Sequence, residues 1–189
     1  MPYNIPNLVT WLRIVLIPLI VAVFYLPDAA LSFHGKNVAA TAIFVFAAIT
    51  DWLDGYLARV LHQISAFGAF LDPVADKLMV AGALIMLLQL ERVESVVALI
   101  IIGREIGISA LREWMAQIGQ SKSVAVAFIG KVKTASQMTA IPLLLFYDDL
   151  FGVLNCQWLG TILINVAAVL TVVSMLYYLR KAMPHVTKD

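Results

Sequence analysis

Four aspartates lie close together in a sequence that is otherwise strongly apolar. Asp51, Asp54, Asp72 and Asp76 fall within residues 51–76, among alanine, isoleucine, valine, leucine and phenylalanine. Ionised side chains are costly inside a membrane, so such a cluster indicates a functional site. The spacing of three residues in the first pair and four in the second places each pair on one face of a helix.

Four carboxylates that face one another across two helices need a counter-charge. Divalent cations bound through oxygen can supply it, and Mg²⁺ or Mn²⁺ suits carboxylate ligands. The residues alone leave two alternatives to a metal site open. The aspartates could form buried ion pairs with Arg59 and Lys77, or they could form the ion pathway of a transporter.

The composition predicts an integral membrane protein. Of the 189 residues, 62% are hydrophobic and 13% are charged, and the mean hydropathy is +0.92, which is more apolar than a soluble domain of this length requires. The formal net charge of +1 indicates no particular partner, and we expect no nucleic acid. Cys156 is the single cysteine, which excludes an intramolecular disulfide and a zinc–cysteine cluster.

Six apolar runs predict six transmembrane helices in an all-α fold. Each run approximates the ~20 residues that cross a bilayer. The first has neither a basic leader nor a clear cleavage site, so it is expected to stay in the mature protein. Pro73 is expected in the first turn of the third helix. We predict one membrane-embedded domain over residues 1–189, with helices at about 8–26, 38–61, 67–90, 95–115, 131–147 and 158–180.

The basic residues predict the orientation of these helices. If both termini are cytoplasmic, only Lys36 and Arg92 fall on the opposite face, in agreement with the positive-inside rule. Both aspartate pairs then lie near the cytoplasmic ends of their helices, in a cytoplasm-facing cavity open to soluble and lipid substrates. The cytoplasmic face collects Arg13, Arg59, Arg112, Lys122, Lys131, Lys133, Arg180, Lys181 and Lys188.

The acidic segment also follows a recognisable pattern. It reads Asp51-x2-Asp54-Gly55-x2-Ala58-Arg59-x8-Gly68-x3-Asp72-x3-Asp76. This resembles the signature of the CDP-alcohol phosphatidyltransferase family, with every fixed position filled. The resemblance implies transfer of a phosphatidyl group from a CDP-linked lipid to an alcohol, with release of CMP. It also implies metal ligands at Asp51, Asp54, Asp72 and Asp76, a general base at Asp76, and a CDP site at Gly55, Arg59, Ser65 and Gly68.

The chemistry of these residues suits that reaction. Two divalent ions held by carboxylates can neutralise a pyrophosphate and stabilise the attacking and leaving oxygens. Glycine permits close approach of a nucleotide, Arg59 can bind a phosphate in bidentate fashion, and a carboxylate can accept the proton of the alcohol. In the alternative interpretation, Gly55 and Gly68 are helix-packing positions and Arg59 is an interfacial side chain.

A second group of charges bears on the acceptor alcohol. Arg104 lies in an apolar helix, Arg112 follows about two turns later, and Lys131 opens the predicted fifth helix. Cations near an acidic metal site favour an acceptor that is itself a phosphate, such as glycerol 3-phosphate or inositol phosphate. Alternatively, Arg104 pairs with Glu105 or Glu113, and Lys131 marks the membrane interface.

The opening segment, residues 4–13, resembles the start of bacterial family members that make phosphatidylglycerophosphate. We therefore expect transfer from CDP-diacylglycerol to glycerol 3-phosphate in a bacterial inner membrane. The alternatives are transfer to inositol phosphate or phosphatidylglycerol, and a cation transporter. Thr10 either reaches the nucleotide or caps the first helix. Gly103-x3-Gly107 suits packing within the chain or a dimer contact, and a homodimer is implied by the family alone.

Overall fold

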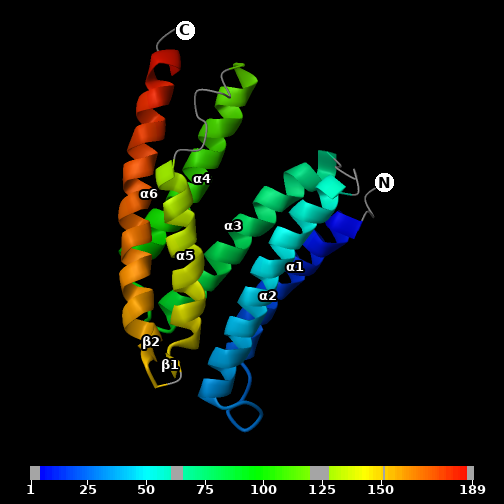
Figure 1. Cartoon of the computed structure of the whole chain (residues 1–189), viewed down its shortest axis with the longest axis vertical. Helices are drawn as coiled ribbons and strands as arrows, with labels where there is room; N and C mark the ends of the chain where they lie inside the picture. The colour runs from blue at the N-terminus through cyan, green and yellow to red at the C-terminus, as the bar shows by residue number, and fades with distance from the viewer. Residues whose placement is uncertain (1–4, 61–65, 120–127, 151, 187–189) are drawn as a thin grey trace.

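The computed structural model describes residues 5–60, 66–119, 128–150 and 152–186, without the side chains of residues 5–7, 52, 54–60, 66, 67, 69 and 184–186. The described residues form six α-helices, which confirms the predicted all-α class (Figure 1). A short hairpin between the last two helices was not predicted. The elements are α1 (Ile5–Phe24), α2 (Phe33–Val60), α3 (Ala66–Gln89), α4 (Ser95–Gln117), α5 (Phe128–Phe146), β1 (Asp149–Leu150), β2 (Leu154–Asn155) and α6 (Cys156–Val186).

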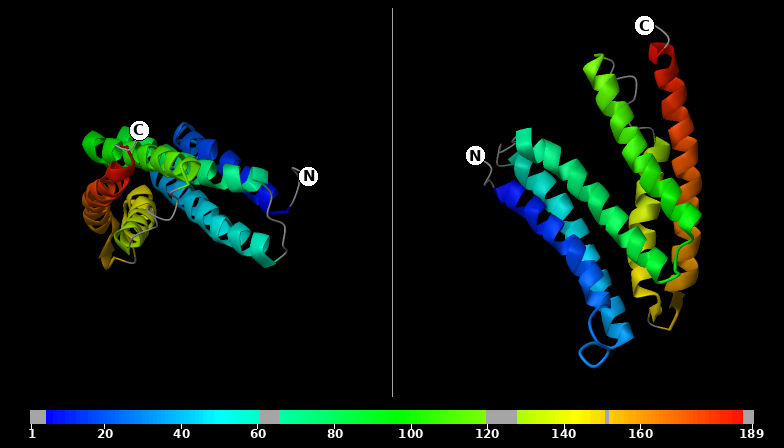
Figure 2. Two further views of the ribbon diagram at one scale, coloured as in Figure 1. Left: turned by 90° about the horizontal axis from the view of Figure 1, so that it is seen from above. Right: turned by 180° about the vertical axis from the view of Figure 1, so that it is seen from behind.

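The helices alternate in direction and form two groups that diverge toward one end of the molecule (Figure 1). One group contains α1, α2 and α3, and the other contains α4, α5 and α6. The view from behind shows α3 leaning across toward the start of α4 (Figure 2). The start of α1 and the end of α6 lie at the diverging end, and the hairpin lies at the other (Figure 1). The end that carries the termini also carries the last turns of α2 and the first turns of α3.

Several helix bounds differ from the sequence predictions: α1 and α5 begin about three residues earlier than predicted, and α6 runs to Val186 rather than to about residue 180. Two further differences are local. Helix α2 begins at Phe33 rather than near residue 38, because the Ser32 hydroxyl accepts a hydrogen bond from the Gly35 amide (3.2 Å) and caps the first turn. Pro73 lies about two turns inside α3, which begins at Ala66, so the expectation of a first-turn position was wrong. Pro18 in α1 and Pro142 in α5 are likewise inside their helices.

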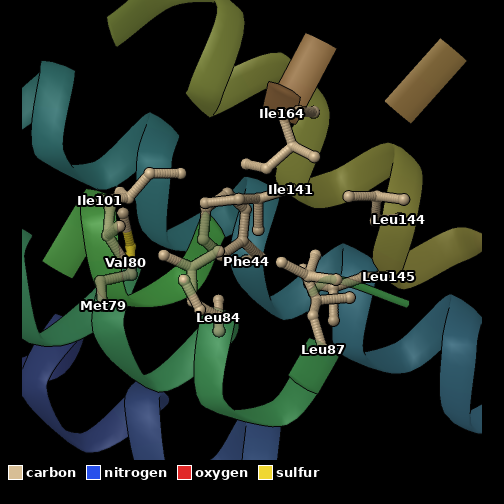
Figure 3. Packing of buried hydrophobic residues seen from close by; sticks show 14 of the residues in the cluster. Phe44, Met79, Val80, Leu84, Leu87, Ile101, Ile141, Leu144, Leu145 and Ile164 are labelled. Atoms are coloured by element: carbon tan, nitrogen blue, oxygen red, sulfur yellow. The ribbon is translucent and has the colours of Figure 1, made fainter. Parts of the chain in front are cut away.

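A hydrophobic core joins the two groups of helices near the end at which they converge. Its side chains come from several helices and interdigitate around Phe44 of α2 (Figure 3). Gly82 lets α3 approach α1 closely, because a Cβ at this position would lie 2.8 Å from Ile17 Cγ2 of α1. The labelled members are Phe44, Met79, Val80, Leu84, Leu87, Ile101, Ile141, Leu144, Leu145 and Ile164.

Two stretches of the described residues are long and apolar enough to cross a membrane by length and composition, Phe33–Asp51 and Cys156–Met183. A shorter apolar stretch covers Leu8–Phe24. Helices α3, α4 and α5 carry charged residues within their apolar runs, which lowers their hydropathy. The charges that suggest function therefore also weaken the membrane signal of the helices that hold them.

Gly103 and Gly107 lie on an open face of α4. Among the described residues, a Cβ added at either position would meet nothing within 4 Å. The structure thus gives no support for packing within the chain as the reason for this pair.

Candidate active site

Arg13 joins the two predicted aspartate pairs. Its side chain has no solvent exposure, and its Nη1 lies 2.7 Å from Asp51 Oδ1 of α2 and 2.6 Å from Asp76 Oδ1 of α3. A buried guanidinium requires such partners. The sequence interpretation offered Arg59 and Lys77 as counter-charges, whereas the structure shows Arg13 of α1 in contact with both carboxylates.

Thr10 supplies the second contact between α1 and the acidic segment. Its hydroxyl donates a hydrogen bond of 2.7 Å to Asp72 Oδ1. Thr10 precedes Arg13 by three residues, so the two side chains share one face of α1. Helix α1 already begins at Ile5, so Thr10 is not an N-terminal cap. Three of the four predicted ligand aspartates thus meet the same face of one helix.

The remaining motif residues flank this cluster. Asp54, Gly55 and Arg59 lie in the last turns of α2, where the side chains are outside the described part, and Ser65 lies outside the described residues altogether. Gly68 is buried in the first turn of α3. Among the described side chains, no three or more acidic, histidine or cysteine groups are close enough to hold one metal ion. Asp51 and Asp76 nevertheless both contact the Arg13 guanidinium, so their carboxylates lie close together. Carboxylate oxygens are also the ligands that Mg²⁺ or Mn²⁺ prefers.

A cavity of about 250 Å³ opens beside these carboxylates, between α2, α3, α4 and α5. Met79 and Val80 of the core form part of its wall. The groups that face it are of mixed charge, as suits a ligand carrying both charge and hydroxyl groups. Its polar lining consists of Asp51, Asp76, Lys77, Glu105, Lys133, Thr134 and Gln137.

Lys133 places a positive charge in this cavity. The residue is only 1% exposed, and its ammonium group forms an ion pair with Glu105 of α4. Lys131, the lysine selected from the sequence, is on an exposed face of α5. Sequence reasoning missed Arg13, Glu105, Lys133 and Gln137 as site residues. For the three charged residues the signal was available, because a charge inside an apolar helix is the same feature that singles out Arg104. Gln137 carries no charge, so this signal could not have found it.

Arg104 and Arg112 both contact α6. Arg104 is buried, donates a hydrogen bond to Ser174 Oγ (3.1 Å) and lies 3.7 Å from Glu105 Oε1. Arg112 donates to the Tyr178 hydroxyl (3.4 Å), and both guanidinium groups lie over the Tyr178 ring. The predicted alternative pairing of Arg104 with Glu105 is therefore present. Through Glu105, Arg104 connects to Lys133 and to the cavity.

A larger cavity of about 400 Å³ lies at the other end of the molecule, around Arg92. Arg92 donates hydrogen bonds to the Leu144 and Leu145 carbonyls and to Asn37 Oδ1. Burial lowers the pKa of Arg92 from its ordinary value, although an arginine stays protonated at neutral pH. Arg92 thus ties α2, α5 and the turn after α3 together, and its cavity lies away from the carboxylates.

Comparison with known proteins agrees with the motif and the geometry. Residues 3–174 match the CDP-alcohol phosphatidyltransferase family, and the chain belongs to this family. The family is associated with membranes, and its members generally use divalent metal ions.

Similar proteins narrow the class further. The chain is 50% identical over 186 residues to the CDP-diacylglycerol–glycerol-3-phosphate 3-phosphatidyltransferase of Salmonella choleraesuis (strain SC-B67), covering 96% of each chain. It is 49% identical over 192 residues to the protein of the same name from Pseudomonas fluorescens, covering 98% of this chain and 93% of the relative. The protein of that name from Shigella flexneri serotype 5b (strain 8401) is 50% identical, with 96% of each chain covered.

Proposed function

We propose that this enzyme transfers a phosphatidyl group from CDP-diacylglycerol to glycerol 3-phosphate, giving phosphatidylglycerophosphate and CMP. The observation that carries the proposal is a cavity lined by groups of both charges. Asp51 and Asp76, held by Arg13, line it together with Lys133. The names of the similar proteins support the same pair of substrates.

In the proposed reaction, the primary hydroxyl oxygen of glycerol 3-phosphate attacks the phosphorus atom attached to the diacylglycerol. A new P–O bond forms to the acceptor, and the P–O bond to CMP breaks. The hydroxyl proton passes to the Asp76 carboxylate, which faces the cavity and acts as general base. Asp76 needs no large movement for this role, because it already borders the space in which the acceptor binds.

Asp51, Asp54, Asp72 and Asp76 would hold two Mg²⁺ or Mn²⁺ ions. When bound, these ions neutralise the pyrophosphate and stabilise the charge that develops on its oxygens. Arg13 keeps Asp51 and Asp76 close together, and Thr10 orients Asp72. On the nucleotide side we propose contacts from Thr10, Gly55, Arg59, Ser65 and Gly68.

The acceptor phosphate is proposed to bind the basic groups of α4 and α5. Lys133 is the direct contact, because it lines the cavity. Arg104 supports it through Glu105, and Arg112 adds positive potential at Lys133. A contribution from Lys131, on the exposed face of α5, is proposed as well. A dianionic acceptor thus has a reason to prefer this cavity, whereas serine or free inositol would leave the cations without a function.

All six helices are proposed to cross the cytoplasmic membrane of a bacterium, with both termini and the active-site cavity on the cytoplasmic side. The alternating helix directions and the position of both termini at one end support an even number of crossings. The open face at Gly103 and Gly107 is available for a second copy, in line with a homodimer.

The proposal is tested with the purified full chain in detergent. CMP release and labelled lipid are measured with CDP-diacylglycerol and a panel of acceptors: glycerol 3-phosphate, inositol phosphate and phosphatidylglycerol. We expect turnover with glycerol 3-phosphate alone, its loss in EDTA and its return with Mg²⁺ or Mn²⁺. Preference for another acceptor would refute the assigned substrate, and turnover in EDTA would refute the metal sites. Absence of CMP release with every acceptor, together with cation flux in vesicles, would favour the transporter.

A further inference from the structure

Gln137 holds a buried polar atom that the described residues do not use. The residue is 2% exposed, and its Oε1 has no hydrogen-bond partner among the described residues. An amide oxygen that loses water on burial without gaining a donor is unfavourable, and such atoms are rare in folded proteins. The atom is therefore expected to meet a donor from outside the described residues, and a bound ligand can supply one.

The position of Gln137 indicates that the donor belongs to a ligand in the cavity beside the aspartates. Gln137 follows Lys133 by four residues on α5, so the two side chains share a helix face. Both line the cavity of about 250 Å³ that also contains Asp51 and Asp76. A molecule with its reacting hydroxyl at Asp76 and its phosphate at Lys133 would share this space with Gln137.

The chemistry of the amide oxygen restricts the ligand further. It only accepts hydrogen bonds, so it cannot recognise a phosphate dianion. Between its primary hydroxyl and its phosphate, glycerol 3-phosphate carries a secondary hydroxyl that takes no part in the transfer. The CDP-lipid also has donors, but its proposed contacts lie mainly at the end of α2 and the start of α3, whereas Gln137 belongs to α5.

We propose that Gln137 is a specificity-determining residue whose Oε1 accepts a hydrogen bond from the secondary hydroxyl of a polyol phosphate acceptor. This inference rests on the proposed function and adds a selection rule to it. The enzyme prefers acceptors with a hydroxyl next to the reacting one over simple alkanol phosphates. The preference arises because an acceptor without that hydroxyl leaves the buried oxygen unpaired.

The test compares two acceptors on the purified full chain in detergent. Glycerol 3-phosphate is matched by 3-hydroxypropyl phosphate, which keeps the primary hydroxyl and the phosphate and lacks the secondary hydroxyl. We expect the wild type to favour glycerol 3-phosphate in kcat/KM by roughly 10- to 100-fold. In Gln137→Met, the ratio should fall to within about threefold, mainly through lost activity on glycerol 3-phosphate.

The control is Gln157→Met, the same substitution at an exposed position in the first turn of α6, which should keep the full ratio. Gln137→Leu serves as a second variant if Gln137→Met does not purify as a single species. Equal losses on both acceptors, with the ratio retained, would make Gln137 a structural residue and overturn the inference. A wild type that does not distinguish the acceptors would also overturn it, while leaving the transfer to glycerol 3-phosphate intact. A wild type inactive on glycerol 3-phosphate would instead refute the proposed function.

Discussion

Asp76 is proposed to combine two tasks, because it contacts Arg13 and lines the cavity proposed for the acceptor. Replacing it with asparagine preserves the shape and removes the proton acceptor. Asp76→Asn should lower kcat by roughly 100-fold or more, the usual scale for a general base. It should weaken CDP-diacylglycerol binding less than Asp51→Asn does. Steady-state kinetics with both substrates varied would measure this, and turnover like that of the wild type would remove Asp76 from the mechanism.

Lys133 and Lys131 offer a matched pair for locating the acceptor phosphate. Lys133→Gln removes a buried charge in the cavity, and Lys131→Gln removes an exposed one. Losing a charge-assisted phosphate contact costs about 1.5–3 kcal/mol, so Lys133→Gln should raise the KM for glycerol 3-phosphate by roughly 10- to 150-fold. The KM for CDP-diacylglycerol should change little. The assignment to Lys133 fails if Lys131→Gln has the larger effect on glycerol 3-phosphate.

These two lysines also show which property of single residues could not be predicted from the sequence, namely which side chain faces inward. The aspartates could be placed on two helix faces because their spacing repeats the turn of a helix. Lys131 and Lys133 differ by two residues, which turns a side chain by about 200° around a helix axis. Only the packing of α5 against its neighbours determines which of the two faces inward. Arg13 was missed for a related reason, since its partners lie on other helices.

At the level of helices, Gly82 and Gly103 differ in what an added methyl group would meet. A Cβ at Gly82 would clash with Ile17 at 2.8 Å, whereas none of the described residues lies within 4 Å of one at Gly103. Overpacking costs about 1–3 kcal/mol, partly offset by about 1 kcal/mol of helix propensity. Gly82→Ala should therefore lower the stability by up to about 2 kcal/mol, whereas Gly103→Ala should not lower it. Thermal unfolding in detergent would show this, and an equal loss in both variants would contradict close packing of α1 on α3.

The six helices were predictable because each contains a long apolar run. The residues at which they begin and end were harder to predict. The first turn of α2 carries His34, Gly35 and Lys36, which resemble a loop until the Ser32 cap is known. The hairpin of β1 and β2 has two residues in each strand, too few for an alternating pattern to appear. Local hydrogen bonds, which composition does not reveal, set these boundaries.

For the whole molecule, the proposed topology predicts which surfaces face the cytoplasm. The turn between α1 and α2, which contains Asp28, and the last turns of α6, which contain Lys181, lie at opposite ends of the molecule (Figure 1). In a Cys156→Ala background, Asp28→Cys should react with a membrane-impermeant maleimide in cells whose outer membrane is permeabilised. Lys181→Cys should react only after the inner membrane is opened. The reverse pattern would invert the topology, and labelling of both in intact inner membranes would disprove an even number of spans.

How the helices meet could not be predicted from the sequence. The aspartate pattern identified the family and two helix faces, yet the contact of α1 with both is a property of the assembled bundle. The same holds for the cavity, whose lining comes from four helices that are far apart in the chain. Membrane helices pack through small residues and shape, and neither determines a unique set of neighbours from one sequence.

Glu105 lies between two cations, which bears on how the cavity could accept a phosphate. Glu105 pairs with Lys133 and has Arg104 as a second neighbour at 3.7 Å. If the acceptor phosphate binds Lys133 as proposed, Glu105 still has Arg104 as a neighbour, so no buried anion is left unpaired. Glu105 would then exchange two cationic partners for one, while Lys133 gains the phosphate as its partner. With Arg104 retained beside Glu105, the empty and the loaded cavity would both keep their buried charges compensated.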